Sequence, residues 1–261
     1  MSIEGKPLRE EKDPILRIRG LQKTFGTQKV LKGVNLDIPR GQITVIIGGS
    51  GCGKSVMLKH IVGLVRPDHG SIALDGADLA VMGSDELKQA RMRYGMLFQD
   101  AALFDSMNVY ENIAFPVREH RPEINESDLA ALIAEKLKQV GLPGVEKKLP
   151  SELSGGMRKR VGLARAIVLN PEIILYDEPT TGLDPLMSRA IDNLIVDTQR
   201  HLNGTTIIIS HDIRATLRIA NKIAMLHDGR IVAEGSNDEI AHSKDPIVRA
   251  FIDPGLEVVK E

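Results

Sequence analysis

Gly48-Gly49-Ser50-Gly51-Cys52-Gly53-Lys54-Ser55 is the stretch that decides the fold, and it follows an apolar run from Gln42 to Ile47. Gly48 and Gly53 free the backbone to turn its N–H groups around a polyphosphate. Lys54 is placed to reach the outer phosphates, and the Ser55 hydroxyl can bind Mg²⁺. The pattern therefore predicts a buried strand, a phosphate-binding loop and a helix, in that order.

The segment after this loop has the spacing of a helix. Leu58, Ile61, Val62 and Val65 recur at i, i+3, i+4 and i+7, which predicts a helix over Val56 to Val65 with its N-terminus toward the anion. A dinucleotide-binding fingerprint would need a third glycine where Val56 stands, so that alternative is weak. A glycine-rich turn without a ligand does not explain the lysine, the serine and the flanking elements.

Length and composition bound the remaining possibilities. The chain has 261 residues, 42% of them hydrophobic, which allows one full core with embellishments or two small domains. A net charge of -1 argues against a polyanion-binding protein, and no nucleic-acid partner is expected. Residues 1–14 lack the apolar core of a signal peptide, and no apolar run approaches the ~18 residues of a membrane helix. We expect a soluble protein without an export signal.

Cys52 is the only cysteine, which rules out an intramolecular disulfide and suggests a reducing compartment. Its place before a helix N-terminus and near Lys54 favours the thiolate, so we expect a maleimide to modify it and to fill space that the phosphates need. The alternative is a small, inert residue that faces protein.

Two alternating segments, Ile15 to Leu21 and Val30 to Ile38, predict an antiparallel β layer, which Ser71 to Leu74 extends. Phe25 lies between the two segments. It is either one more core aromatic or a ring on which adenine stacks, and the sequence leaves both open.

The region from Asp100 to Pro150 is predicted to be helical, with Ser127 as an N-cap and Gly141 as a stop. Inserted between strands of an α/β core, it has the character of a helical subdomain. Ala101 to Met107 is more apolar than a surface loop, so it either packs locally or, for part of its length, forms a docking surface, which we favour. The end of the chain is also predicted to be helical, over Asn237 to Phe251.

Three further sites carry groups suited to phosphate chemistry. Leu153 to Met157 places Ser154 and two glycines at a helix start, a second anion-binding terminus. The apolar run ending at Tyr176 delivers Asp177 and Glu178 to the carboxyl end of a strand, where a Mg²⁺-side carboxylate and a base for water are expected. His211 follows another buried strand and is interpreted as a γ-phosphate contact rather than a structural histidine.

Six motifs thus occur in order along the chain: Gly48 to Ser55, Gln99, Leu153 to Met157, Asp177-Glu178, Gly182-Leu183-Asp184 and His211. Together they closely resemble the ATP-binding subunit of ABC transporters, over nearly the whole chain. The resemblance implies an α/β fold, a P-loop NTPase core of ABC type with an antiparallel β subdomain and an inserted α-helical subdomain. It implies one such domain over 1–261, with the core and β layer at 15–98 and 151–235, the helical subdomain at 100–150, and a C-terminal helical segment and tail at 236–261.

The resemblance also implies a role for each matched residue, with ATP and Mg²⁺ as cofactors. Glu178 would polarise the attacking water, His211 would sense the γ-phosphate, and Ser55, Gln99 and, through water, Asp177 would serve Mg²⁺; Lys54 completes the catalytic set. ATP would contact Phe25, Gly48, Gly49, Ser50, Gly51, Cys52, Gly53, Lys54, Ser55 and Val56. A second protomer's Ser154, Gly155 and Gly156 would bind its γ-phosphate, which makes the functional unit a head-to-tail homodimer with Asp184 communicating between the sites.

Gly49, Met157 and Gly182 depart from the commonest family pattern, where proline, glutamine and alanine are usual, but no catalytic group is lost. With neighbouring segments such as Leu103 to Ser106, they look like the Mla/Mkl branch, whose transporters move phospholipid in the bacterial envelope. This likeness implies a peripheral protein on the cytoplasmic face of the inner membrane. Its partners would be integral-membrane permease subunits of the MlaE type, with MCE-domain and STAS-domain subunits as further candidates.

Other functions are less consistent with the sequence. A soluble ABC-type ATPase acting on ribosomes or DNA would favour tandem ATPase units or a long coiled-coil insertion, and neither pattern occurs here. A GTPase needs an Asn-Lys-x-Asp motif, and Asn221-Lys222-Ile223-Ala224 lacks the acid. A P-loop kinase leaves Leu153 to Met157 unexplained. The sequence leaves open the alternative of an ABC ATPase that serves a different small-molecule transporter.

Overall fold

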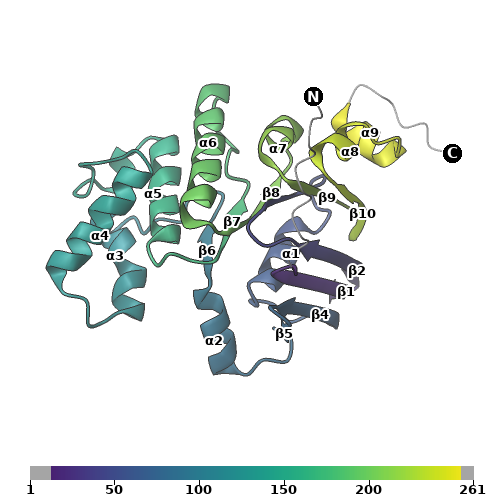
Figure 1. Cartoon of the computed structure of the whole chain (residues 1–261), viewed down its shortest axis with the longest axis horizontal. Helices are drawn as coiled ribbons and strands as arrows, with labels where there is room; N and C mark the ends of the chain where they lie inside the picture. The colour runs from purple at the N-terminus through teal and green to yellow at the C-terminus, as the bar shows by residue number, and fades with distance from the viewer. Residues whose placement is uncertain (1–12, 254–261) are drawn as a thin grey trace, which may run out of the picture.

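The computed structural model describes residues 13–253, and in this range two β-sheets and their covering helices form the α/β fold that the sequence predicts (Figure 1). The predicted tail beyond Asp253 lies outside the described residues. Among residues 13–253, no helix combines the length and the apolar character needed to cross a membrane.

The central sheet has six strands in the spatial order β10-β9-β3-β8-β7-β6. Neighbours from β9 to β6 run parallel, and the β9–β10 hairpin is antiparallel. Every residue of β3 and β8 is buried, as expected for parallel strands covered on both faces. The strands are β3 (Ile43–Ile47), β6 (Tyr94–Leu97), β7 (Ile173–Asp177), β8 (Thr205–Ser210), β9 (Lys222–His227) and β10 (Arg230–Gly235).

The second sheet is the predicted antiparallel layer, in the order β2-β1-β4-β5. Its strands are β1 (Leu16–Phe25), β2 (Gln28–Ile38), β4 (His69–Leu74) and β5 (Ala77–Asp78). Asp75 and Gly76 join β4 to β5 with φ of 49° and 83°, a pair of left-handed residues that suits a tight hairpin. Phe25 ends β1 with 47% of its surface exposed, so it is not a core aromatic.

The helices cover both faces of the central sheet, and α3, α4 and α5 pack together at one end of the molecule (Figure 1). This group contains the predicted helical insertion. The helices are α1 (Lys54–Ile61), α2 (Ser84–Met92), α3 (Val109–His120), α4 (Glu126–Gln139), the short η1 (Pro150–Glu152), α5 (Gly155–Ile167), α6 (Pro185–Leu202), α7 (Ile213–Ile219), α8 (Asn237–Ala241) and α9 (Pro246–Ile252).

Two predicted helix boundaries are wrong. The helix after the phosphate loop does not reach Val65, because Gly63 adopts a left-handed φ of 68° and terminates α1 one turn earlier. In α4 the N-cap is Asn125 rather than Ser127, since the Asn125 side chain accepts a hydrogen bond from the N–H of Asp128 at 2.9 Å.

The predicted helix over Asn237 to Phe251 is divided in two. The chain leaves the helical path after α8, and α9 starts again with Asp245 as its N-cap and Pro246 in the first turn. Asp245 accepts hydrogen bonds from the N–H groups of Ile247 and Val248, so a second cap makes a separate helix possible.

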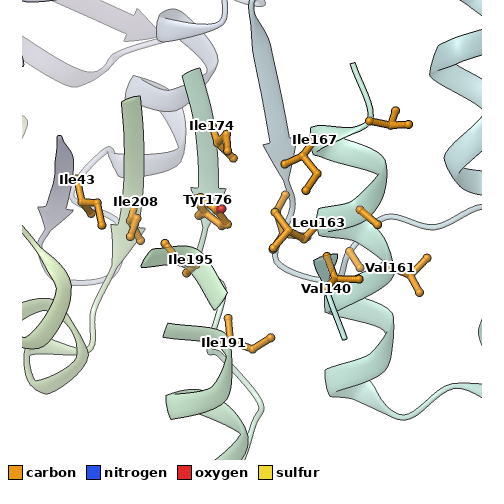
Figure 2. Close-up of a cluster of buried hydrophobic side chains, with 14 of the residues drawn as sticks. Ile43, Val140, Val161, Leu163, Ile167, Ile174, Tyr176, Ile191, Ile195 and Ile208 are labelled. Atoms are coloured by element: carbon orange, nitrogen blue, oxygen red, sulfur yellow. The ribbon is translucent and has the colours of Figure 1, made fainter. Parts of the chain in front are cut away.

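The largest core cluster lies between the central sheet and the helices α5 and α6 (Figure 2). Tyr176, one residue before the end of β7, is fully buried among aliphatic side chains. The labelled members of this cluster are Ile43, Val140, Val161, Leu163, Ile167, Ile174, Tyr176, Ile191, Ile195 and Ile208. The packing fixes the parallel strands relative to one another, and with them the loops at their carboxyl ends.

Candidate nucleotide-binding and hydrolysis site

Three predicted motifs meet at the carboxyl edge of the central sheet because β3, β8 and β7 are parallel neighbours. Ile47 pairs with Ser210, and Asp177 pairs with Ile209. The phosphate loop, the Asp177-Glu178 pair and His211 each begin within one or two residues of these strand ends. The edge thus brings together groups that the sequence predicts to lie at one site.

The phosphate loop is shaped by close backbone contacts that exclude larger side chains. A Cβ atom added at Gly48 would lie 2.2 Å from the carbonyl oxygen of Leu226. Gly53 has a φ of 109°, and a Cβ there would lie 3.2 Å from the carbonyl oxygen of Val30. Glycine is therefore required at both positions, as predicted from the motif. The second contact also shows that the start of β2 packs against the loop.

Lys54 lies inside the loop with only 8% of its surface exposed. Its ammonium group donates to the carbonyl oxygens of Gly48 at 2.8 Å and Gly49 at 3.0 Å. The charge is thus held within the loop where the sequence predicts phosphates. Gly49, Ser50, Gly51 and Ser55 are exposed around it, and Val56 is half-buried.

The two acidic residues at the end of β7 have different surroundings. Burial raises the pKa of the Asp177 carboxyl, and the neighbouring Glu178 raises it further, while Lys54 lowers it. Glu178 takes a left-handed φ of 49° and accepts a hydrogen bond from the Thr181 hydroxyl at 3.1 Å. Its other contact is the Nδ1 atom of His211, 2.5 Å from the same carboxylate oxygen. The carboxylate predicted to be the base is therefore held by two side chains.

Gln99 lies beside this edge, whereas Phe25 belongs to the antiparallel sheet. Gln99 is exposed two residues after β6, whose Leu97 pairs with Tyr176 of β7. Phe25 is carried by the β1–β2 hairpin, and the Lys23 ammonium lies 5.6 Å from its ring centroid. One face of an exposed ring with a cation nearby suits stacking on a base, so the stacking alternative fits and stays a prediction.

Ser154, Gly155 and Gly156 lie apart from the loop, at the start of α5. Ser154 is the N-cap and accepts from the N–H of Met157 at 3.3 Å. Gly156 is packed so tightly that a Cβ would lie 2.5 Å from the Cε atom of Met187. Figure 1 shows α5 grouped with α3 and α4, and α1 beside the antiparallel sheet. This separation is compatible with the prediction that the serine serves a second molecule.

No sequence motif pointed to Lys159 or Thr181. Lys159 follows Gly156 by one helical turn on α5 and is 6% exposed, and burial lowers the pKa of its ammonium group. Its Nζ atom donates to the carbonyl oxygens of Pro179 and Thr181, both at 2.7 Å. The sequence does carry a signal for Lys159. This lysine lies on the apolar face of a predicted helix, between Gly156 and Leu163, where a charged residue is unusual.

The expectation of a reactive Cys52 thiolate is wrong in its premise. Burial raises the pKa of the Cys52 thiol, and the nearby Lys54 only partly offsets this. The side chain is half-buried, and its sulfur would lie 2.8 Å from a Cβ at Gly48, so it faces the protein beneath the loop.

We predict that maleimide labels native Cys52 slowly at pH 7 and faster as pH rises toward the raised thiol pKa, because the thiolate is the reacting form. The measurement is the labelling rate by intact mass between about pH 6 and 9, with the urea-denatured chain as the reference for an accessible thiol. Cys52→Ala is the unlabelled control. Native labelling at pH 7 as fast as in the denatured chain would contradict this prediction.

The fold and site define a P-loop ATPase of the ATP-binding cassette class. The ABC transporter family model matches residues 31–181, and the chain belongs to this family. It is an ATPase. It is 45% identical over 237 residues to "Probable ribonucleotide transport ATP-binding protein mkl" of Mycobacterium leprae, covering 91% of this chain and 68% of that protein.

Two further proteins are informative. The chain is 41% identical over 239 residues to the intermembrane phospholipid transport system ATP-binding protein MlaF of Escherichia coli K12, covering 92% of this chain and 88% of that protein. The ATP-binding cassette MJ0796, in a dimeric post-hydrolysis structure with ADP and Pi, superposes with a TM-score of 0.78 at 30% identity. That match covers 85% of this chain and 98% of MJ0796. The expected family and fold are confirmed.

Proposed function

We propose that this chain is the ATP-hydrolysing subunit of a bacterial ABC transporter whose separate membrane permease moves phospholipid between the inner and outer membranes. The observation that carries the proposal is 41% identity to MlaF over 88% of that protein's length. The mkl protein, at 45% identity, is named for ribonucleotide transport, which is the second candidate cargo. The proposed location is the cytoplasmic face of the inner membrane, with the chain as a peripheral subunit.

In the proposed mechanism the phosphate loop binds ATP through its backbone N–H groups and the α1 N-terminus, and Lys54 contacts the β- and γ-phosphates. Ser55, Gln99 and, through water, Asp177 offer oxygen donors of the hard type that Mg²⁺ prefers, and would hold this ion. Residues 13–253 contain no group of three or more His, Cys, Asp or Glu suited to a metal. The ion would be held by few protein groups and by substrate phosphates, and it would supply positive charge against the charge that develops on the phosphates.

Glu178 is the proposed base that orients and deprotonates the attacking water. Its carboxylate is fixed by Thr181 and by His211, contacts that restrict its rotamer at the sheet edge. His211 also has 59% of its side chain exposed, which leaves it accessible to a γ-phosphate in the same place. Phe25 is the proposed stacking surface for adenine. The roles proposed for Glu178 and His211 use side chains that contact each other at the sheet edge.

The proposed assembly is a homodimer in which each ATP lies between one protomer's phosphate loop and its partner's Ser154 segment. The dimeric state of MJ0796 supports it, because that cassette shares 30% identity and the fold. ATP would close the dimer and hydrolysis would reopen it, with Asp184 communicating between the sites. MlaE-type permease subunits, and MCE-domain and STAS-domain subunits, are the proposed partners.

A groove beside β6, the edge strand of the central sheet, is the proposed contact with the permease. It has a volume of about 660 Å³ and is lined by Phe98, Phe104 and Phe115 among other residues. All three rings are exposed, although Ala101 in the same predicted docking segment is fully buried. The segment is therefore part core and part surface. Exposed aromatic rings around a groove are typical of a protein interface.

The proposal is tested by purifying the tagged full-length chain from detergent-solubilised native membranes and identifying its partners and bound lipid. We expect a permease and phospholipid, with phospholipid vesicles stimulating ATPase activity of the purified complex. Phe104→Asp should lose the permease, whereas Val81→Asp, which alters a residue that is 80% exposed and outside the groove, should retain it. Ribosomal or DNA-bound partners would contradict the phospholipid function. Stimulation of the ATPase activity by a ribonucleotide other than ATP, in the absence of phospholipid, would contradict it as well.

A further inference from the structure

The buried Lys159 joins two parts of the chain that belong to different nucleotide sites in the proposed dimer. It lies on α5, one turn after the Ser154-Gly155-Gly156 segment that faces the partner's ATP in that proposal. Its hydrogen bonds reach 20 and 22 residues along the chain, to Pro179 and Thr181 in the loop after β7. That loop follows Glu178, which acts on the chain's own ATP in the same proposal.

A short series of hydrogen bonds leads from this lysine to the Glu178 carboxylate. The Lys159 ammonium donates to the Thr181 carbonyl at 2.7 Å, and the Thr181 hydroxyl donates to Glu178 at 3.1 Å. The Thr181 N–H also donates to the Glu178 carbonyl oxygen at 3.2 Å. A displacement of Thr181 would therefore shift the positions of both the backbone carbonyl and the carboxylate of Glu178.

The chemistry of the contact suits fixing a loop. An ammonium group has three donors, and two of them bind carbonyl oxygens of one turn, Pro179 to Thr181. Among residues 13–253, these are the hydrogen bonds that join this turn to α5. Hydrogen bonds to a charged group are stronger than neutral ones and are costly to leave unmade in a buried place. Asp100 and Glu178 are the acidic groups whose charges raise the pKa of the Lys159 ammonium group, against the larger lowering by burial.

We propose that Lys159 is a positioning residue for ATP hydrolysis, which holds Glu178 in place through Thr181. In this way Lys159 connects the chain's own hydrolysis site to the helix that contacts the partner's nucleotide. The inference rests on the proposed role of Glu178 and on the proposed dimer. It requires no contact between Lys159 and ATP. The effect of the lysine is therefore expected on turnover rather than on nucleotide affinity.

The first experiment compares two buried lysines in the full-length chain. Lys159→Met removes every donor at similar length, and we expect kcat to fall about 10-fold or more with KM for ATP within about 2-fold, because a misplaced base slows the chemical step. Lys136→Met is the matched control, since Lys136 is also buried but donates to Asn170 away from the sheet edge. Lys159→Gln, which retains an amide donor, should restore part of the lost turnover.

A second experiment separates positioning of Glu178 from a role of Lys159 in nucleotide contact across the dimer. In a Glu178→Gln background, adding Lys159→Met should leave the ATP-dependent dimer intact by size-exclusion chromatography and lower residual hydrolysis by less than about 2-fold, because the positioned base is already absent. Loss of that dimer would show that Lys159 acts on the partner's site and would overturn the inference.

The inference also fails if Lys159→Met keeps kcat within 2-fold of the unmodified chain, or if the loss matches that of Lys136→Met. Thermal unfolding of each variant separates these outcomes from simple unfolding, and Lys159→Gln supplies the test if the methionine variant does not fold. If Glu178→Gln itself hydrolyses ATP normally, the role of Glu178 fails instead. The two failures are therefore distinguished by different variants.

Discussion

Replacing Glu178 with glutamine is expected to lower ATP hydrolysis at least ~10²-fold while ATP binding is retained. The glutamine keeps the shape and an oxygen for the Thr181 hydroxyl, but it can no longer take a proton from water. The phosphate loop and Lys54 are unchanged, so the variant should accumulate as an ATP-bound dimer. Steady-state phosphate release and size-exclusion chromatography with ATP measure the two effects.

Glu172→Gln is the matched control for this substitution. Glu172 lies just before β7, at the opposite end of the strand from Glu178, where it forms an ion pair with Arg93 at 2.6 Å. Arg93 keeps its second carboxylate partner, Asp75, when Glu172 loses its charge, so this control should fold and turn over ATP normally. Turnover of Glu178→Gln near that of the control would refute the catalytic role given to Glu178.

Replacing Ser154 with arginine is expected to abolish hydrolysis without unfolding the chain or preventing ATP from binding the phosphate loop. Ser154 is exposed at the start of α5, so a larger side chain has room in the single chain. In the proposed dimer, however, the same side chain would fill the space of the partner's γ-phosphate. Ser151→Arg, which alters an exposed position in η1, is the control and should remain active.

Mixing Ser154→Arg with Lys54→Ala tests whether the sites are shared between protomers. A heterodimer carries both defects at one composite site and neither at the other. When equal amounts exchange subunits at random, half of the dimers are mixed and each has one intact site of two, so two inactive proteins should regain about a quarter of the activity. A strictly monomeric fraction that hydrolyses ATP at the full rate would rule out this arrangement.

Local sequence patterns identified the phosphate loop, the strands around it and the acids that follow β7, for a common physical reason. Each depends on neighbours in the chain: glycines that allow a tight loop, apolar runs that make buried strands, and polar residues placed directly after them. Parallel strands present their carboxyl ends on one edge, so Asp177 and His211 could be assigned to the same region as Lys54 without coordinates.

The sequence was less informative where two local signals compete. Ser127 and Asn125 are both good caps, and only the path of the chain selects Asn125. Phe25 could have been buried or exposed, since an aromatic ring suits either place, and its exposure depends on what packs over the end of β1.

The sequence by itself determined that this protein is an ABC ATPase with a phosphate loop, and it predicted which residues carry the chemistry. Only the tertiary structure decided that the Cys52 thiol has a raised pKa and that Lys159 holds the loop beside Glu178. The physical reason is that a motif records what a residue type can do in its local backbone. Burial and a hydrogen bond to a residue more than 20 positions away depend on which other elements pack against it.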